Sequence, residues 1–167
     1  EVDFYGKLVS LAKQGGIPVI VDTSGALLAE TVKAKPTMIK PNTDQIGQLL
    51  GRRVQSRQEV IDAAWELHQS GIPYVVVSLG KDGSVMACEE GIFQGITPDI
   101  PVVNTVGCGD SMVAGFAAAM ARGKGPEAML RLATAVSTAN ALTMQTGHFE
   151  QEDLDRVLPL TAVKKIK

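Results

Sequence analysis

The chain reads NTVGCGDS at residues 104–111 and continues as MVAGFAAAMA at residues 112–121. Two glycines flank one small residue, so the backbone can turn tightly and aim its amide hydrogens outward. A run of small apolar residues follows at once and predicts a helix, whose first N–H groups and positive dipole end favour an anion. The stretch therefore predicts a phosphate-binding loop at the start of a buried helix.

Asp110 is unusual in such a loop, because a carboxylate repels a phosphate group. One explanation is catalytic: the carboxylate takes a proton from the group that attacks the phosphorus. The other is structural: Asp110 or Ser111 is the N-cap of the helix, and the glycines form the turn before it. A bare G-x-G-D favours the structural explanation. We also expect that a valine at Gly109 would block the phosphate and disfavour the positive φ of the turn.

The longer run N-T-V-G-C-G-D-S-M-V-A-G-F resembles the second signature of the PfkB family of carbohydrate kinases, commonly D-T-x-G-A-G-D-x-F-x-x-G. Asn104 stands at the first Asp of that signature, and Cys108 stands at its usual Ala. Both are departures from the family pattern. Because cysteine is small, Cys108 should keep the turn.

The segment I-K-P-N, residues 39–42, resembles the family's K-P-N segment, whose Asn and following Glu (N-x-x-E) help to hold magnesium and the phosphates. This chain has Gln45 at the Glu position, and a neutral amide is a weaker metal ligand. A structural explanation is equally open here. Asn42 with Gln45 at the third helical position also fits an N-cap and its capping box.

Two other segments add to the resemblance. Residues 78–83, S-L-G-K-D-G, resemble the family's nucleotide loop S/T-L-G-x-x-G, and they lie between the other two segments in the family's order. Residues 22–25, D-T-S-G, match a segment typical of the branch that phosphorylates sugar phosphates, the fructose-1-phosphate and tagatose-6-phosphate kinases. An ordinary turn is the alternative for each segment.

The resemblance implies transfer of the γ-phosphoryl group of ATP to a hydroxyl of a sugar phosphate, of the fructose 1-phosphate or tagatose 6-phosphate class. Asp110 would accept the hydroxyl proton, and the backbone amides of Gly107, Cys108 and Gly109 would stabilise the transferring charge. Magnesium would bridge the phosphates, with Asn42 and Gln45 as indirect ligands. The implied nucleotide-binding residues are Lys40, Asn42, Ser78, Gly80, Lys81, Gly83 and Thr134.

The order of predicted elements favours an α/β fold. Strands are expected at 18–22, 37–40, 74–79, 102–103, and in a hairpin of 84–88 with 92–94. Helices are expected at 4–12, 27–33, 43–50, 56–69, 109–121, 127–144 and 151–158. This alternation predicts a mostly parallel sheet covered on both faces, a three-layer αβα sandwich that the resemblance makes ribokinase-like.

Polar residues follow several of the predicted strands. Asp22, residues 40–42, residues 78–83 and the loop 107–110 each come after a strand. Because ligands gather at the carboxyl ends of parallel strands, we expect these residues to line one rim. We expect Trp65, on the apolar side of its helix, and the two histidines, His68 and His148, to be structural.

The composition bounds the class of protein. With 167 residues and 45% hydrophobic content the chain suits one globular domain, and its net charge of −2 argues against nucleic-acid or membrane partners that need a basic surface. Its two cysteines form no framework, which favours a reducing compartment and disfavours a structural metal. No apolar run approaches the roughly 20 residues that span a bilayer, so the cytoplasm is the default. A homodimer is possible.

The first residue is Glu1, and an amphipathic helix pattern begins at once. We therefore expect that residues 1–167 are the C-terminal nucleotide-binding and catalytic portion of a sugar kinase. The N-terminal portion, with the substrate site and lid, would lie upstream.

Two other classes of function compete with the kinase. A nucleotide-binding regulatory module without catalysis would use the same loop, and its nucleotide binding would be indifferent to a change at Asp110. A Rossmann-type dehydrogenase is disfavoured, because no G-x-G-x-x-G follows the first strand.

Overall fold

The computed structural model describes residues 2–167. It divides into two compact units. The N-terminal unit contains the residues up to Leu79 together with 84–92, and the C-terminal unit contains residues 80–83 together with 93–167. Among the described residues, no helix is both long enough and apolar enough to cross a bilayer.

The strands of the N-terminal unit confirm the predicted parallel sheet. They are β1 (Ile20–Val21), β2 (Met38–Ile39), β3 (Tyr74–Ser78) and β4 (Ser84–Cys88). β1 pairs parallel with β2, and β2 pairs parallel with β3. β4 runs antiparallel to β3, with Val77 opposite Val85. The parallel strands leave their carboxyl ends on one edge of this sheet.

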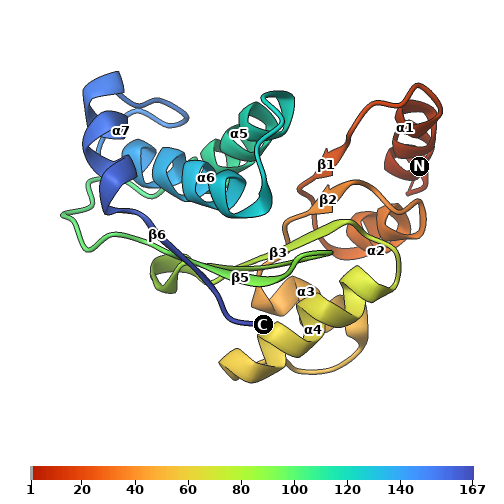
Figure 1. Cartoon of the computed structure of the whole chain (residues 1–167). Coiled ribbons are helices and arrows are strands. Elements are labelled where there is room, and N and C mark those ends of the chain that lie inside the picture. The colour runs from red at the N-terminus through yellow and green to blue at the C-terminus, as the bar shows by residue number, and fades with distance from the viewer. Residues whose placement is uncertain (1) are drawn as a thin grey trace. The chain divides into compact units, whose positions relative to one another are not determined.

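Four helices belong to the same unit and appear in red to yellow in Figure 1: α1 (Phe4–Gln14), α2 (Gly25–Lys33), α3 (Thr43–Leu50) and α4 (Arg57–Gln69). Both predicted capping boxes are formed, by Asn42 with Gln45 and by Ser56 with Glu59. α3 ends at Gly51, which takes a left-handed conformation with φ 64°. Local sequence signals thus set where α3 begins and ends and where α4 begins.

The core of this unit forms between the helices and one face of the sheet. Val75 and Val77 of β3 lie in one buried cluster with Leu28 of α2, Ile46 of α3 and Ala63 of α4. Alternate residues of a strand point to the same face, so β3 offers a full row of valines to these helices. Helix packing onto this row holds the ends of the parallel strands in place.

The C-terminal unit contains most of β5 (Gly91–Ile96), and β6 (Ala162–Lys165) pairs antiparallel with it. Its helices are α5 (Cys108–Ala121), α6 (Pro126–Ala141) and α7 (Gln151–Val157). α5 and α6 pack closely, because a Cβ atom at Gly115 would lie only 2.6 Å from the Ala133 Cα. Pro126 is the first residue of α6, as predicted.

One strand was predicted wrongly and one was missed. Val102 and Val103 form no strand, and both are more than half exposed. The Val103 and Asn104 N–H groups donate instead to the Ala141 carbonyl, at 2.8 and 3.1 Å. The last carbonyl groups of a helix have no intrahelical partners. At the end of α6, one of these carbonyls accepts hydrogen bonds from the N–H groups that a strand at residues 102–103 would have used for pairing. The missed strand is β6, which lacks an apolar alternation.

Candidate active site

The loop before α5 has Gly107 at its centre. Gly107 is the N-cap of α5 and takes a left-handed conformation with φ 85°. The helix begins at Cys108, so Asp110 is its third residue, and Ser111 is buried with its N–H bonded to the Gly107 carbonyl at 2.8 Å. The structural alternative, in which Asp110 or Ser111 caps the helix, is therefore excluded. A residue with no side chain holds the cap position.

The positive φ expected at Gly109 belongs to Gly107 instead. Gly109 lies within α5 and is not among the residues with positive φ. A Cβ atom at Gly107 would lie 2.8 Å from both the Gly147 nitrogen and the Thr146 Cγ2. Two independent features, conformation and close approach, thus require glycine at position 107.

Unpaired backbone donors lie at the start of α5. The Cys108 N–H donates to the Thr105 carbonyl at 3.2 Å. Among the described residues, the N–H groups of Gly109 and Asp110 take part in no backbone hydrogen bond outside the helix interior, and their helical acceptors would precede the helix. The Asp110 side chain is exposed beside them. The site therefore combines free N–H groups with an accessible carboxylate, which suits binding an anion next to a proton acceptor.

Two asparagines tie this loop to the end of α6. Asn104 accepts a hydrogen bond from the Val106 N–H at 3.0 Å and donates to the Met144 carbonyl at 3.1 Å. Asn140 of α6 donates to the Val106 carbonyl at 3.0 Å and accepts from the Gly147 N–H at 2.8 Å. Asn140 was not among the predicted site residues. Its signal is a single amide side chain in a helix end, S-T-A-N-A-L, that has no charged residue.

In the N-terminal unit, the segments after β1, β2 and β3 meet as predicted. Lys40 is only 7% exposed, and its Nζ lies 3.0 Å from the Asp22 Oδ2. Asn42 and Ser78 form a parallel bridge, and the Ser78 N–H donates to the Pro41 carbonyl at 3.0 Å. Asp22, the K-P-N segment and Ser78 therefore share one edge of this unit.

The side chains of Asn42 and Gln45 are engaged in the capping box. The Asn42 Oδ1 accepts from the Gln45 N–H, and the Gln45 Oε1 accepts from the Asn42 N–H, each at 2.8 Å. No group of three or more acidic, histidine or cysteine residues that could hold a metal occurs among residues 2–167. Magnesium commonly keeps several waters and binds through substrate phosphates. These residues fit an ion held through the phosphates better than one held directly.

The remaining predicted nucleotide residues fall in the C-terminal unit. Gly80 and Lys81 are exposed and begin a short 3-10 turn, Gly80–Asp82. Gly83 is buried with φ 87°, and a Cβ atom there would overlap the Gly95 carbonyl oxygen, so close packing already accounts for this glycine. Thr134 is 3% exposed, and its buried hydroxyl has no hydrogen-bond partner among the described residues.

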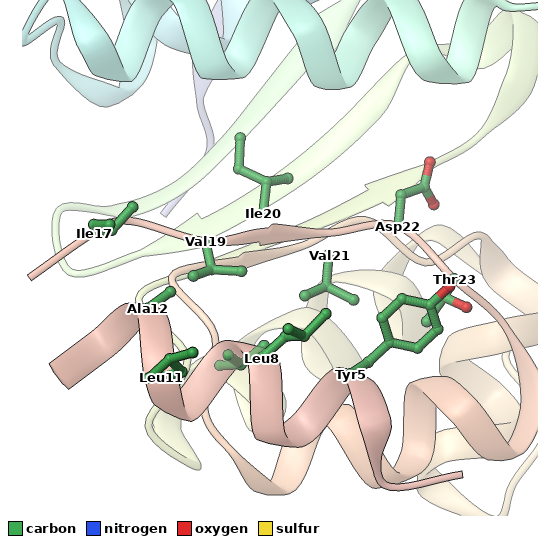
Figure 2. Close-up of a pocket in the computed structure, with 11 residues that line it drawn as sticks. Tyr5, Leu8, Leu11, Ala12, Ile17, Val19, Ile20, Val21, Asp22 and Thr23 are labelled. Atoms are coloured by element: carbon green, nitrogen blue, oxygen red, sulfur yellow. The ribbon is translucent and has the colours of Figure 1, made fainter. Parts of the chain in front are cut away.

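An apolar hollow of about 560 Å³ lies between α1 and β1, and Asp22 and Thr23 are among the residues that line it. Figure 2 shows Val19 and Val21 pointing toward α1, whereas Ile20 and Asp22 point to the opposite side of the strand. Leu11, on α1, is 66% exposed. Because its walls are almost entirely aliphatic, this hollow does not suit a phosphate group.

The residues predicted to be structural make local contacts. The His68 Nδ1 lies 2.9 Å from the Ile72 carbonyl oxygen, and its ring lies 5.1 Å from that of Trp65. The His148 Nε2 lies 3.0 Å from the Glu150 Oε1.

A parallel α/β sheet and a glycine turn at the start of a helix are features that phosphate-binding α/β proteins share. Residues 2–153 match the model of the pfkB family of carbohydrate kinases. The chain belongs to this family.

Individual relatives agree. The chain is 37% identical to a tagatose-6-phosphate kinase of Staphylococcus epidermidis over 160 residues, covering 94% of this chain and 52% of the relative. Phosphofructokinase-2 from Escherichia coli, in complex with potassium, superposes with a TM-score of 0.90 at 30% identity, covering 95% of this chain and 52% of that one. Arabidopsis thaliana ribokinase, complexed with ribose and ATP, superposes with a TM-score of 0.82 at 25% identity, covering 95% and 53%.

These matches confirm the predicted ribokinase-like αβα fold class. They also show that the chain spans about half the length of the relatives it matches.

Proposed function

We propose that this chain forms the nucleotide-binding and phosphoryl-transfer part of a kinase that uses ATP to phosphorylate a hydroxyl of a sugar phosphate. The substrate class would be fructose 1-phosphate or tagatose 6-phosphate. Support comes from family membership, from the 37% identity to a tagatose-6-phosphate kinase and from the D-T-S-G segment at residues 22–25. The proposal places the sugar site and lid in the part of such a kinase that this chain does not contain.

The observation that carries the proposal is the pairing of Asp110 with free backbone donors. The carboxylate is exposed in the first turn of α5, next to the unpaired N–H of Gly109. The helix cap is already supplied by Gly107, so capping does not account for Asp110. A proton acceptor beside an anion site is what attack by a sugar hydroxyl on a phosphoryl group requires.

The roles of the residues follow from this arrangement. Asp110 accepts the proton of the attacking hydroxyl, while the N–H groups of Gly107 and Gly109 stabilise charge on the transferring group. The Cys108 N–H contributes if it leaves its 3.2 Å bond to Thr105. Lys40, Asn42, Ser78, Gly80, Lys81, Gly83 and Thr134 are proposed to line the nucleotide site. Magnesium, when bound to ATP, would neutralise phosphate charge.

The test is Asp110→Asn in the full-length kinase that contains this segment. Loss of a general base commonly costs about 10²–10⁴ in rate, so we expect kcat to fall by that factor while ATP affinity stays nearly unchanged. The matched control is Glu152→Gln, which removes an exposed charge from the first turn of α7, outside the proposed site. The control should keep kcat within about twofold, as surface changes usually do.

A result within a few-fold of the unchanged enzyme for Asp110→Asn would exclude a general-base role. Nucleotide binding that is unaffected by Asp110→Asn, in a protein that shows no sugar-dependent turnover with or without the change, would instead favour the nucleotide-binding module without catalysis.

A further inference from the structure

Asn140 is a fully buried amide near the C-terminal end of α6. Burying an amide side chain is unfavourable unless its donors and acceptor find partners. The neighbouring residues Ala139 and Ala141 are also buried. Burial at this end of α6 therefore does not by itself require a polar side chain. The choice of asparagine at position 140 needs another explanation.

The side chain of Asn140 directs its polar atoms at both sides of the Gly107 turn. Its Nδ2 donates to the Val106 carbonyl at 3.0 Å and lies 3.4 Å from the Cys108 Sγ. Its Oδ1 accepts from the Gly147 N–H at 2.8 Å. One amide therefore joins the residue before Gly107, the residue after it and the turn that follows α6.

Gly107 leaves almost no room for an alternative arrangement. A Cβ atom there would lie 3.4 Å from the Asn140 Oδ1 and closer still to Gly147 and Thr146. With the Val106 carbonyl held by Asn140, the peptide between Val106 and Gly107 has its orientation set. That peptide carries the Gly107 N–H, and the Gly109 N–H follows two residues later in the first turn of α5.

We propose that Asn140 is a positioning residue for phosphoryl transfer, which orients the N–H groups of the Gly107 turn toward the transferring phosphoryl group. This inference rests on the proposed function. Donors aimed in advance at developing charge stabilise it without reorganisation during the reaction, and each such donor is commonly worth about 10²–10³ in kcat. A donor that is still present but wrongly oriented should lower kcat by part of this factor of about 10²–10³.

The experiment replaces Asn140 in the full-length kinase and compares kcat with KM. Both Asn140→Ala and Asn140→Thr remove the hydrogen bond to the Val106 carbonyl. Alanine leaves no polar atom at this position, whereas threonine keeps a hydroxyl group. We expect either variant to lower kcat by about 10-fold or more, as partial loss of an oriented donor predicts. The KM for the sugar phosphate should change by less than about twofold, because the loop does not bind the sugar.

Thr138→Val is the matched control. Thr138 is buried on the same helix, and its hydroxyl donates to the Thr134 carbonyl at 2.8 Å, so its hydrogen bond stays within α6. Thr138→Val should lower the free energy of unfolding, because a buried hydrogen bond is lost. It should leave kcat nearly unchanged. This separates general damage to α6 from loss of loop orientation.

Cys108 offers a second readout that does not depend on activity. Cys88 is buried, whereas Cys108 is half-buried and in contact with Asn140. We expect Asn140→Ala to raise the rate at which a thiol reagent such as dithionitrobenzoate modifies Cys108 by several-fold, and Thr138→Val to leave that rate unchanged.

Three results would overturn the proposal. The first is a kcat for Asn140→Ala or Asn140→Thr no lower than that of Thr138→Val. The second is unchanged Cys108 reactivity, and the third is failure of both variants to fold, which would make Asn140 a determinant of the fold alone. Running Asp110→Asn in parallel keeps the two proposals apart. If that variant retains activity the proposed function fails, and if it is inactive while Asn140→Ala is active, only the positioning role fails.

Discussion

Gly107 shows how much a single residue can control at this site. Its left-handed backbone turns the chain into α5, and the absence of a Cβ lets the turn at Thr146 and Gly147 approach closely. Gly109, only two positions away, lies in the first turn of α5 and does not take a positive φ. The two glycines of the motif therefore have different tasks.

We predict that Gly107→Ala and Gly109→Ala change the free energy of unfolding in opposite directions. Gly107→Ala should destabilise the fold, because a left-handed L-residue costs roughly 1–2 kcal/mol before any clash with Gly147 is counted. Gly109→Ala should be neutral or stabilise α5 by up to about 1 kcal/mol, since alanine is the better helix former. Urea denaturation followed by circular dichroism measures both changes. Equal destabilisation by the two would contradict the different tasks assigned here.

Residue-level prediction from the sequence succeeded where the cause is local. The capping partners of Asn42 and Ser56 lie three residues away, and both boxes are formed as predicted. The positive φ was expected at Gly109 and is found at Gly107, where Asn140 and Gly147, distant in sequence from the motif, lie close to the turn. The roles of Asp110 and the nucleotide-binding residues stay predictions.

At the scale of elements, the start of α4 depends on an exposed carboxylate. The N–H groups of Ser56 and Gln55 donate to the Glu59 Oε2 at 2.8 and 2.9 Å. These bonds to the charged form lower the pKa of Glu59 below its ordinary value of 4.5. A lowered folded-state pKa adds stability above the unfolded value, and that stability is lost as the pH falls through the folded pKa.

We therefore predict a pH-dependent effect of Glu59→Gln. Above a pH of about 5 the protein with Glu59 should be more stable than the Glu59→Gln variant, because the Glu59 carboxylate is fully ionised in this range. As the pH falls below 4.5 and through the lower folded value, the difference between the two chains should shrink toward zero. Urea midpoints at pH 7, 5 and 3 measure it. A difference that is the same at all three values would show that the charge of the cap is unimportant.

The packing of α5 on α6 leads to a second prediction for elements. Gly115→Val should destabilise the fold by about 1–3 kcal/mol or more, because overpacking at the Ala133 backbone forces the two helices apart. The control Ala117→Val places the same side chain on an exposed position of α5 and should cost less than about 1 kcal/mol. Thermal unfolding distinguishes them. Comparable losses would mean that valine acts through helix propensity rather than through packing.

Elements with a strong pattern of their own could be predicted, and those that depend on a distant partner could not. The start of α4 is fixed by Ser56 and Glu59, and the three central residues of β3 are all valine. The segment at Val102 and Val103 has the composition of a strand, but the end of α6 takes its N–H groups. β6 contains two lysines in its four residues and is a strand only because β5 lies beside it.

At the scale of the whole molecule, the chain carries two units and about half the length of its relatives. The residues proposed for nucleotide binding and phosphoryl transfer occur in both units. None of them forms a cluster of cationic or amide donors suited to a second phosphate, that of the sugar. The expectation that the sugar site lies outside these residues rests on the family resemblance and on no pattern within the sequence itself.

We predict that this chain by itself does not phosphorylate fructose 1-phosphate or tagatose 6-phosphate. The physical reason is that the acceptor hydroxyl must be held near Asp110, and positioning of this kind supplies roughly 7–11 kcal/mol of the barrier in well-oriented systems. A coupled assay with ATP and magnesium measures turnover. Rates on the order of 1–100 per second, ordinary for kinases, would place a complete sugar site within these residues.

The pairing of β6 with β5 has a consequence for how this protein is handled and probed. Alternate backbone amides of residues 93–96 face a strand formed by Ala162–Lys165, which is mostly exposed and contains two lysines. Their exchange with deuterated solvent should therefore follow the opening of the C-terminal strand rather than global unfolding. A purification tag fused after Lys167 would lie directly beyond this pair, so the exchange rate of β5 is also the natural check on whether such a tag has disturbed the fold.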